Sequence, residues 1–192
     1  TFTPSAKRQT IHALLPRRTK LSRLSPAGEE QILAANIDTV FVVQGLDGNY
    51  NPKRLERYLA AAQAGGAEAV VVLNKADLDP DAALKVAEIR LLGHNAPILL
   101  LDSLSRTGYE ALNAHITAGR TILLAGSSGA GKSTIINNLM GSDLQRTAAV
   151  REEDSRGRHT TTGRKLFLLP SSGALLIDTP GIGSTFRHNT EA

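Results

Sequence analysis

Residues Thr121-Ile-Leu-Leu-Ala-Gly126-Ser-Ser-Gly-Ala-Gly131-Lys-Ser133 join a short apolar run to a glycine-rich loop. The last eight, Gly126 to Ser133, match the phosphate-binding pattern G-x-x-x-x-G-K-[ST] at every specified position. The stretch Lys132–Met140 then continues as an amphipathic segment. An apolar strand, a glycine-rich loop and a helix in this order predict a phosphate-binding loop within an α/β domain.

Each part of this loop has an expected role. The glycines permit backbone conformations and a close approach that a Cβ atom would block. Successive N–H groups are expected to cradle phosphate oxygens at the positive end of the following helix. Lys132 is expected to neutralise the β- and γ-phosphates, and the Ser133 hydroxyl to bind Mg²⁺. The predicted nucleotide contacts here are Gly126, Ser127, Ser128, Gly129, Ala130, Gly131, Lys132, Ser133 and Thr134.

A second motif, Asn74-Lys75-Ala76-Asp77, follows the apolar run 69–73. This position corresponds to the carboxyl end of a strand, where open α/β sheets bind ligands. The Asp77 carboxylate can accept hydrogen bonds from guanine N1–H and the exocyclic amine, a donor pair that adenine lacks. Asn74 is expected to tie the loops together, and the Lys75 stem to cover the base and ribose. The motif therefore predicts guanine recognition.

The order of the two motifs is unusual. In ordinary GTPases the N-K-x-D motif follows the phosphate loop, whereas here it precedes it. We therefore expect a circularly permuted GTPase domain.

Apolar runs alternate with amphipathic stretches along most of the chain. Near-continuous Val, Ile and Leu content is typical of strands buried on both faces of a parallel sheet. Strands are expected at 39–44, 69–73, 97–101, 121–125, 166–169 and 174–177, and helices at 52–64, 80–92, 108–118 and 132–140. This alternation predicts a three-layer α/β fold with a mostly parallel sheet. The first 25 residues do not follow it, and we expect a separate element or linker there.

Two segments near the C-terminus are candidate switch elements. Asp178-Thr-Pro-Gly181 follows an apolar run, so Asp178 could hold Mg²⁺ through a water while the Gly181 N–H senses the γ-phosphate. The segment 158–163 contains three adjacent threonines, one of which could close on Mg²⁺ in the triphosphate state. We favour Thr161 over Thr160 as this ligand, and the sequence leaves the choice open.

The catalytic prediction concerns His159. Many GTPases place a water-orienting glutamine just after the Asp-x-x-Gly motif, but here that position is Ile182, which cannot orient water. His159 is the candidate replacement, with Lys132 compensating the phosphate charge. The alternatives are that His159 contacts phosphate or RNA, or is simply an exposed loop residue.

Composition narrows the class of protein. The chain has 192 residues, a net charge of +4 and no cysteine, so it contains no disulfide and no thiolate zinc site. It lacks both a membrane-length apolar run and the apolar centre of a secretory signal, which predicts a cytoplasmic protein. Two basic clusters could contact RNA phosphates or form an ordinary solvated surface. They are Lys7, Arg8, Arg17, Arg18, Lys20 and Arg23, and Arg156, Arg158, His159, Arg164 and Lys165.

Together the motifs Asn74–Asp77, Gly126–Ser133, 157–162 and Asp178–Gly181 resemble the RsgA (YjeQ) family of ribosome-associated GTPases. The similarity covers roughly residues 11–185. It implies a circularly permuted P-loop GTPase fold that binds GTP or GDP with Mg²⁺. The resemblance also assigns Ser103, in Asp102-Ser103-Leu104, to the loop that meets guanine.

The family resemblance further implies how the chain is organised and what it binds. Residues 1–25 would be the remnant of an N-terminal OB-fold or a linker, and residues 26–192 the permuted GTPase domain, with the family's C-terminal zinc domain absent. The expected partners are the small ribosomal subunit and its rRNA during late maturation. The lack of a long apolar run and of cysteine adds the expectation of no membrane and no zinc. A monomer with slow hydrolysis, stimulated by the ribosome, is expected.

Two other functions stay open at this stage. One is a GTP-dependent RNA-binding module in which hydrolysis is incidental. The other is a small-molecule kinase that uses the same phosphate loop, which would transfer phosphate to an acceptor and would not need Asp77.

Overall fold

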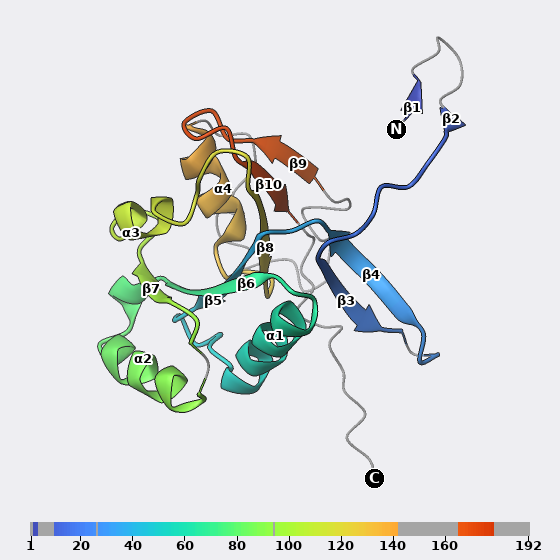
Figure 1. Ribbon diagram of the computed structural model, residues 1–192. Helices are drawn as coiled ribbons and strands as arrows, with labels where there is room; N and C mark the ends of the chain where they lie inside the picture. Colours follow the sequence, from blue (N-terminus) through green and yellow to red (C-terminus); the bar gives the residue numbers. More distant parts are fainter. Residues whose placement is uncertain (1, 4–9, 26, 94, 142–164, 179–192) are drawn as a thin grey trace, which may run out of the picture.

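The centre of the molecule is a six-stranded sheet with the order β7-β6-β5-β8-β10-β9 (Figure 1). This computed structural model describes residues 2–3, 10–25, 27–93, 95–141 and 165–178. The strands of the sheet are β5 (Thr39–Gly45), β6 (Glu68–Asn74), β7 (Ile98–Leu101), β8 (Thr121–Gly126), β9 (Lys165–Leu168) and β10 (Leu175–Asp178). All neighbouring pairs are parallel except β9 with β10, so the predicted mostly parallel sheet is confirmed.

The sheet grows in two directions from its middle. From β5 the chain moves outward through β6 to β7, whereas from β8 it moves the other way to β9 and β10. Neighbouring strands β5 and β8 are therefore a topological switch point, because the connections that leave them diverge. In open α/β sheets, ligands bind in the crevice at the carboxyl ends of such strands.

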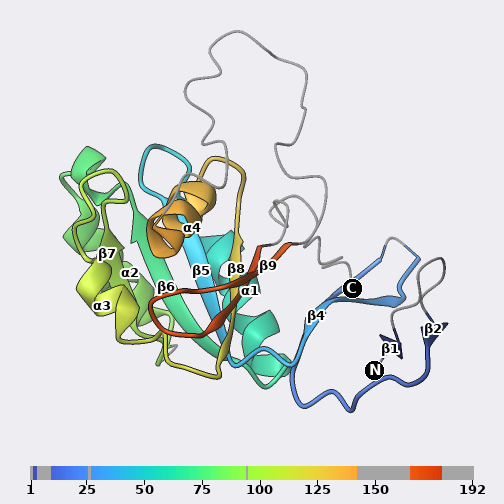
Figure 2. The same cartoon turned by 90° about the horizontal axis from the view of Figure 1, so that it is seen from above.

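Helices cover both faces of the sheet, as the predicted three-layer fold requires (Figures 1 and 2). One face carries α1 (Pro52–Ala64) and α2 (Ala82–Leu91), and the other carries α3 (Tyr109–Asn113) and α4 (Lys132–Met140). A single 3-10 turn, Ala76–Leu78, follows β6.

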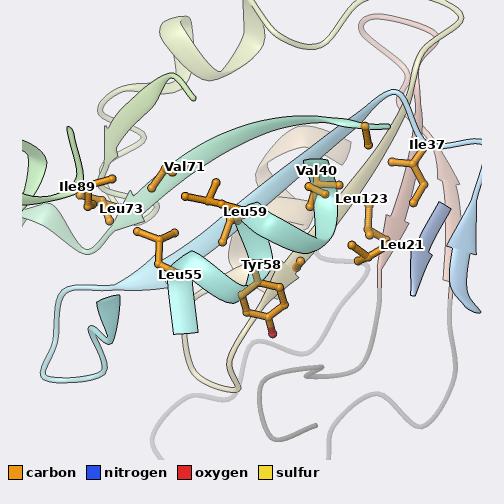
Figure 3. Packing of buried hydrophobic residues seen from close by; sticks show 14 of the residues in the cluster. Leu21, Ile37, Val40, Leu55, Tyr58, Leu59, Val71, Leu73, Ile89 and Leu123 are labelled. Carbon is orange, nitrogen blue, oxygen red and sulfur yellow. The ribbon is translucent and has the colours of Figure 1, made fainter. Parts of the chain in front are cut away.

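Alternation along β5 shows how both faces are filled. Val40 and Val42 belong to the core on the α1 side, whereas Phe41 and Val43 belong to the core on the α4 side. All four are essentially inaccessible to water. Figure 3 shows the first core, where Leu55, Tyr58 and Leu59 of α1 lie against strand residues. Burial on two faces explains why the strand sequences read as continuous apolar runs.

Two helices have the bounds expected from the sequence, and two are shorter. The α1 and α4 bounds match the prediction, since Asn51 caps α1 through the Arg54 N–H and Gly65 and Gly141 follow the two helices. The second helix begins at Ala82 rather than at Pro80. The third helix ends at Asn113 rather than at 118. After it, the backbone hydrogen bonds span three residues instead of the four of an α-helix, from His115 N–H to Leu112 O and from Ile116 N–H to Asn113 O.

A β-hairpin links the first 25 residues to the sheet domain. Strand β3 (Lys20–Leu24) pairs antiparallel with β4 (Glu30–Ala35), and Ser25 and Glu29 close the turn between them. Leu21 of β3 is fully buried in the core on the α1 side. The hairpin therefore crosses the domain boundary expected at residue 25, and residues 20–24 pack with the domain. Whether residues 1–25 derive from an OB-fold stays a prediction. A further short pair joins β1 (Phe2–Thr3) to β2 (Thr10–Ile11).

Candidate nucleotide-binding site

The predicted guanine and phosphate motifs lie together at one edge of the sheet. Strands β5, β6 and β8 end at Gly45, Asn74 and Gly126. Gly45 is in register with Asn74, and Val43 of β5 is in register with Gly126. Because the strands are parallel, the loops that follow them lie at the same end of the sheet, at the switch point where open α/β sheets bind ligands. Motifs 52 positions apart in sequence thus form one site.

The shape of the phosphate loop depends on two of its glycines. A Cβ atom on Gly126 would lie 2.3 Å from the Val43 carbonyl oxygen, so β8 could not approach β5 as it does. A Cβ atom on Gly131 would lie 2.0 Å from the Asn74 amide nitrogen, and Gly131 also has a positive φ of +94°. These contacts give a physical reason for glycine at both positions.

Asn74 connects three parts of the site. Its side chain is buried, and Nδ2 donates to the Ala130 carbonyl oxygen of the phosphate loop at 2.9 Å. Its Oδ1 accepts from the Ser103 N–H at 3.2 Å and from the Ser103 hydroxyl at 2.6 Å. The guanine motif, the phosphate loop and the loop after β7 are therefore held by one amide group. This agrees with the tying role expected of Asn74.

Ser103 is fixed from a second side. Asn138 of α4 donates to the Ser103 carbonyl oxygen at 2.6 Å and also contacts the Tyr109 hydroxyl at 2.9 Å. The N–H of Ser103 is engaged by Asn74. A direct contact between Ser103 and guanine stays a prediction.

Lys132 turns back onto its own loop. Its Nζ donates to the Gly126 carbonyl oxygen at 2.9 Å and to the Ser127 carbonyl oxygen at 2.7 Å, and the side chain is largely buried. Burial lowers the pKa of Lys132 to about 8. The negative charge of Asp178 opposes this shift, because it favours the protonated amine. A polyanion that displaces the two carbonyl groups would stabilise the charged amine.

Ser133 and Asp178 are the described candidates for Mg²⁺ ligands. Ser133 lies in the first turn of α4, directly after Lys132, and is half-buried. Asp178 ends β10, in register with Leu124 of β8, and is 3% exposed. The negative charge of Asp178 raises the pKa of Lys132, in opposition to the effect of burial. A hydroxyl and a carboxylate are oxygen donors of the kind Mg²⁺ prefers.

Lys75 and Asp77 lie on the turn after β6. Lys75 has a left-handed backbone conformation, with φ of +62°, and its ammonium group pairs with Asp47. Asp77 lies in the 3-10 turn with its side chain exposed to solvent, so its carboxylate is accessible to a base. The remaining predicted residues His159, Thr161 and Gly181 lie outside the described residues.

A protein-family model described as RsgA GTPase matches residues 14–186. The chain belongs to the RsgA GTPase family. The small ribosomal subunit biogenesis GTPase RsgA of Methanosarcina acetivorans is 48% identical to this RsgA-family chain over 181 residues, which are 93% of this chain and 49% of that protein. The protein of the same name from Xanthomonas euvesicatoria is 54% identical over 177 residues, which are 90% of this chain and 48% of that protein. This chain thus spans about half the length of these curated relatives.

Solved structures agree with the family and the fold. The crystal structure of YjeQ from Thermotoga maritima matches with a TM-score of 0.67 and 26% identity, covering 98% of this chain and 60% of that one. The structure of YloQ, described as a circularly permuted GTPase, matches with a TM-score of 0.62 and 17% identity. The match covers 99% of this chain and 57% of that one. Together with the motif order, these matches confirm the predicted circularly permuted GTPase fold of this RsgA-family chain.

Two side chains beside the phosphate and guanine motifs of this RsgA-family chain were missed from the sequence. Asp47 contacts Lys75, and Asn49 donates to Ser127 and Ser128 of the phosphate loop. Both lie in Asp47-Gly-Asn49, which has the composition of an ordinary turn and gives no further signal. Among the described residues, no group of three or more His, Asp or Glu side chains forms a metal site, and no helix is long and apolar enough to cross a membrane.

Proposed function

We propose that this chain is a GTP-binding and GTP-hydrolysing switch that acts as a cytoplasmic monomer on the small ribosomal subunit, with contacts to rRNA. The observation that carries the proposal is the Asn74 side chain, which joins the guanine motif to the phosphate loop through Ala130. A site that reads guanine and phosphate together binds guanine nucleotides rather than phosphate alone.

The described residues have distinct roles in this proposal. Loop residues 126–131 present backbone N–H groups to the phosphates, and Lys132 leaves its carbonyl partners to neutralise them. The exposed Asp77 carboxylate accepts the guanine N1–H and amine, while Lys75 covers the base. Ser133 and Asp178 would hold Mg²⁺, directly and through water respectively. When bound, Mg²⁺ supplies charge neutralisation at the β- and γ-phosphates.

Hydrolysis by the isolated chain is expected to be slow. Ile182 occupies the position where many GTPases carry a water-orienting glutamine, and His159 is the proposed substitute. In this proposal Thr161 and Gly181 close on the metal and the γ-phosphate. Binding to the ribosomal subunit would complete this arrangement and raise the rate.

Two observations support a ribosomal partner. The curated relatives carry the name small ribosomal subunit biogenesis GTPase. In this chain Arg17 and Arg18 are exposed just before β3, where they could approach a phosphate backbone. Part of this charge is already offset, since Arg18 lies 3.9 Å from Asp38. Binding to rRNA through these arginines should therefore weaken only modestly as salt concentration rises, because at most two phosphates are contacted.

Single-turnover GTP hydrolysis with and without purified small ribosomal subunits tests the proposal. A rate increase that requires intact subunits supports the GTPase switch. Binding to the subunit without acceleration would instead indicate an RNA-binding module with incidental hydrolysis. Transfer of the γ-phosphate to an acceptor other than water would indicate a kinase and refute the proposal.

A further inference from the structure

The loop that leaves β5 at the switch point, residues 46–51, lies between the two motifs of the site. We refer to it as the bridging loop. Its base is rigid, because the buried Gln44 side chain exchanges hydrogen bonds with Asn51, donating to the Asn51 carbonyl oxygen at 3.2 Å and accepting from the Asn51 N–H at 3.0 Å. Asn51 also caps α1 by accepting from the Arg54 N–H at 2.9 Å.

The start of the bridging loop contacts the guanine motif. The Leu46 N–H donates to the Asn74 carbonyl oxygen at 2.9 Å, and the Asp47 carboxylate pairs with the Lys75 ammonium group. The loop is therefore anchored to the end of β6 as well as to its own strand.

Its other end contacts the phosphate loop. Asn49 Nδ2 donates to the Ser127 hydroxyl at 3.2 Å and to the Ser128 carbonyl oxygen at 3.1 Å. In a planar trans peptide, the carbonyl and the next N–H point in opposite directions. Holding the Ser128 carbonyl toward Asn49 thus turns the Gly129 N–H away from it. Asn74 acts in the same way on Ala130, so two asparagines from adjacent strand ends orient alternate peptides of the cradle.

Arg54 fixes which way the Asn49 amide points. Its guanidinium Nη2 donates to the Asn49 backbone carbonyl and, at 3.1 Å, to the Asn49 side-chain Oδ1. A guanidinium only donates, so it selects the amide oxygen and directs the amide nitrogen to the phosphate loop. Hydrogen bonds thus connect Arg54, in the first turn of α1, to Asn49, and Asn49 to the phosphate-loop peptides that are expected to contact phosphate.

We propose that Asn49, oriented by Arg54, is a positioning residue for binding of the β-phosphate. The inference rests on the proposed function, since it requires a guanine nucleotide in this loop. Asn49 does not touch the nucleotide in this account. It acts by preorganising the Gly129 N–H, which reduces the ordering that a diphosphate must otherwise impose.

The test compares the affinities of the 192-residue chain for GDP and GMP by calorimetry. GMP presents the same guanine without a β-phosphate. In Asn49→Ala the affinity for GDP should fall about tenfold, because two hydrogen bonds that hold the phosphate loop are lost. The affinity for GMP should fall less than about twofold. Asn113→Ala, at an exposed asparagine of α3, is the matched control and should leave both affinities unchanged.

The outcomes separate the inference from the proposed function. An equal loss for GDP and GMP, or no loss for either, overturns the positioning role. If the wild-type chain binds neither nucleotide, the proposed function fails, and the inference fails with it. Thermal unfolding without nucleotide checks that Asn49→Ala remains folded. Asn49→Leu, which is close in size and removes the donor without adding a charge, should reproduce the selective loss of GDP affinity.

A double-mutant cycle tests the role of Arg54. If Arg54 acts through Asn49, Arg54→Ala alone should lower GDP affinity. The double variant Arg54→Ala/Asn49→Ala should then bind GDP no more than about twofold more weakly than Asn49→Ala. Fully additive losses would mean that Arg54 acts on the nucleotide by another route, and would overturn its place in the proposal.

Discussion

Nucleotide binding should take up a proton at Lys132. Burial lowers the pKa of this amine to about 8, with Asp178 opposing the shift. Its ammonium group bonds only carbonyl oxygens of Gly126 and Ser127 among the partners described. Phosphate oxygens would favour the charged form far more strongly, so the pKa in the complex should rise well above that of the free protein.

The sign and size of the effect follow from this difference. With a pKa of about 8, the free Lys132 amine is about nine-tenths protonated at pH 7 and about one-tenth at pH 9. If the bound amine stays charged throughout, Lys132 contributes almost no pH dependence below pH 7 and lowers GDP affinity about tenfold between pH 7 and pH 9. Near pH 8, binding should take up about half a proton.

Calorimetry in buffers of different ionisation enthalpy measures this uptake directly. GMP is the control, because it shares titration of the guanine ring but lacks the β-phosphate that Lys132 is expected to meet. The difference between GDP and GMP isolates the lysine. Equal pH profiles for the two nucleotides, or no proton uptake at pH 8, would refute the reasoning from burial.

Two further changes test the core and the catalytic prediction. Leu21→Ala should lower the free energy of unfolding, measured by urea titration, by about 3 kcal/mol, because Leu21 is fully buried. The control Leu24→Ala should lower it by under about 0.5 kcal/mol, because Leu24 is 57% exposed. Equal effects would show that the hairpin does not share the core. His159→Ala should reduce ribosome-stimulated hydrolysis about a hundredfold or more without changing GDP affinity. Intact stimulated turnover would remove His159 from the catalytic role.

Features with a local cause could be predicted from the sequence. The α1 bounds follow from an asparagine cap, a first-turn proline and Gly65 at its end, whereas α4 lies between Gly131 and Gly141. The sheet strands were predictable because burial on both faces requires continuous apolar residues. The phosphate and guanine motifs were predictable because the chemistry requires particular residues at fixed spacing.

Features that depend on distant contacts could not be predicted in this way. Strand β3 is short and carries Lys20 and Arg23, and only its pairing with β4 and the burial of Leu21 make it part of the core. Ile116 is buried beyond the end of α3, so its apolar spacing suggested a longer helix than the backbone forms. The Asn49 contact joins residues 79 positions apart, and a local pattern cannot encode it.

The central claim is that Asp77 reads guanine in a site completed by the phosphate loop. Replacing Asp77 by Asn removes the carboxylate that accepts both guanine donors, and favours xanthine, which carries a carbonyl in place of the exocyclic amine. The measurement is the affinity of wild-type and Asp77→Asn chains for GDP and xanthosine diphosphate. The account predicts that the variant loses GDP affinity by about a hundredfold or more and prefers xanthosine diphosphate. Unchanged GDP affinity in Asp77→Asn would contradict it.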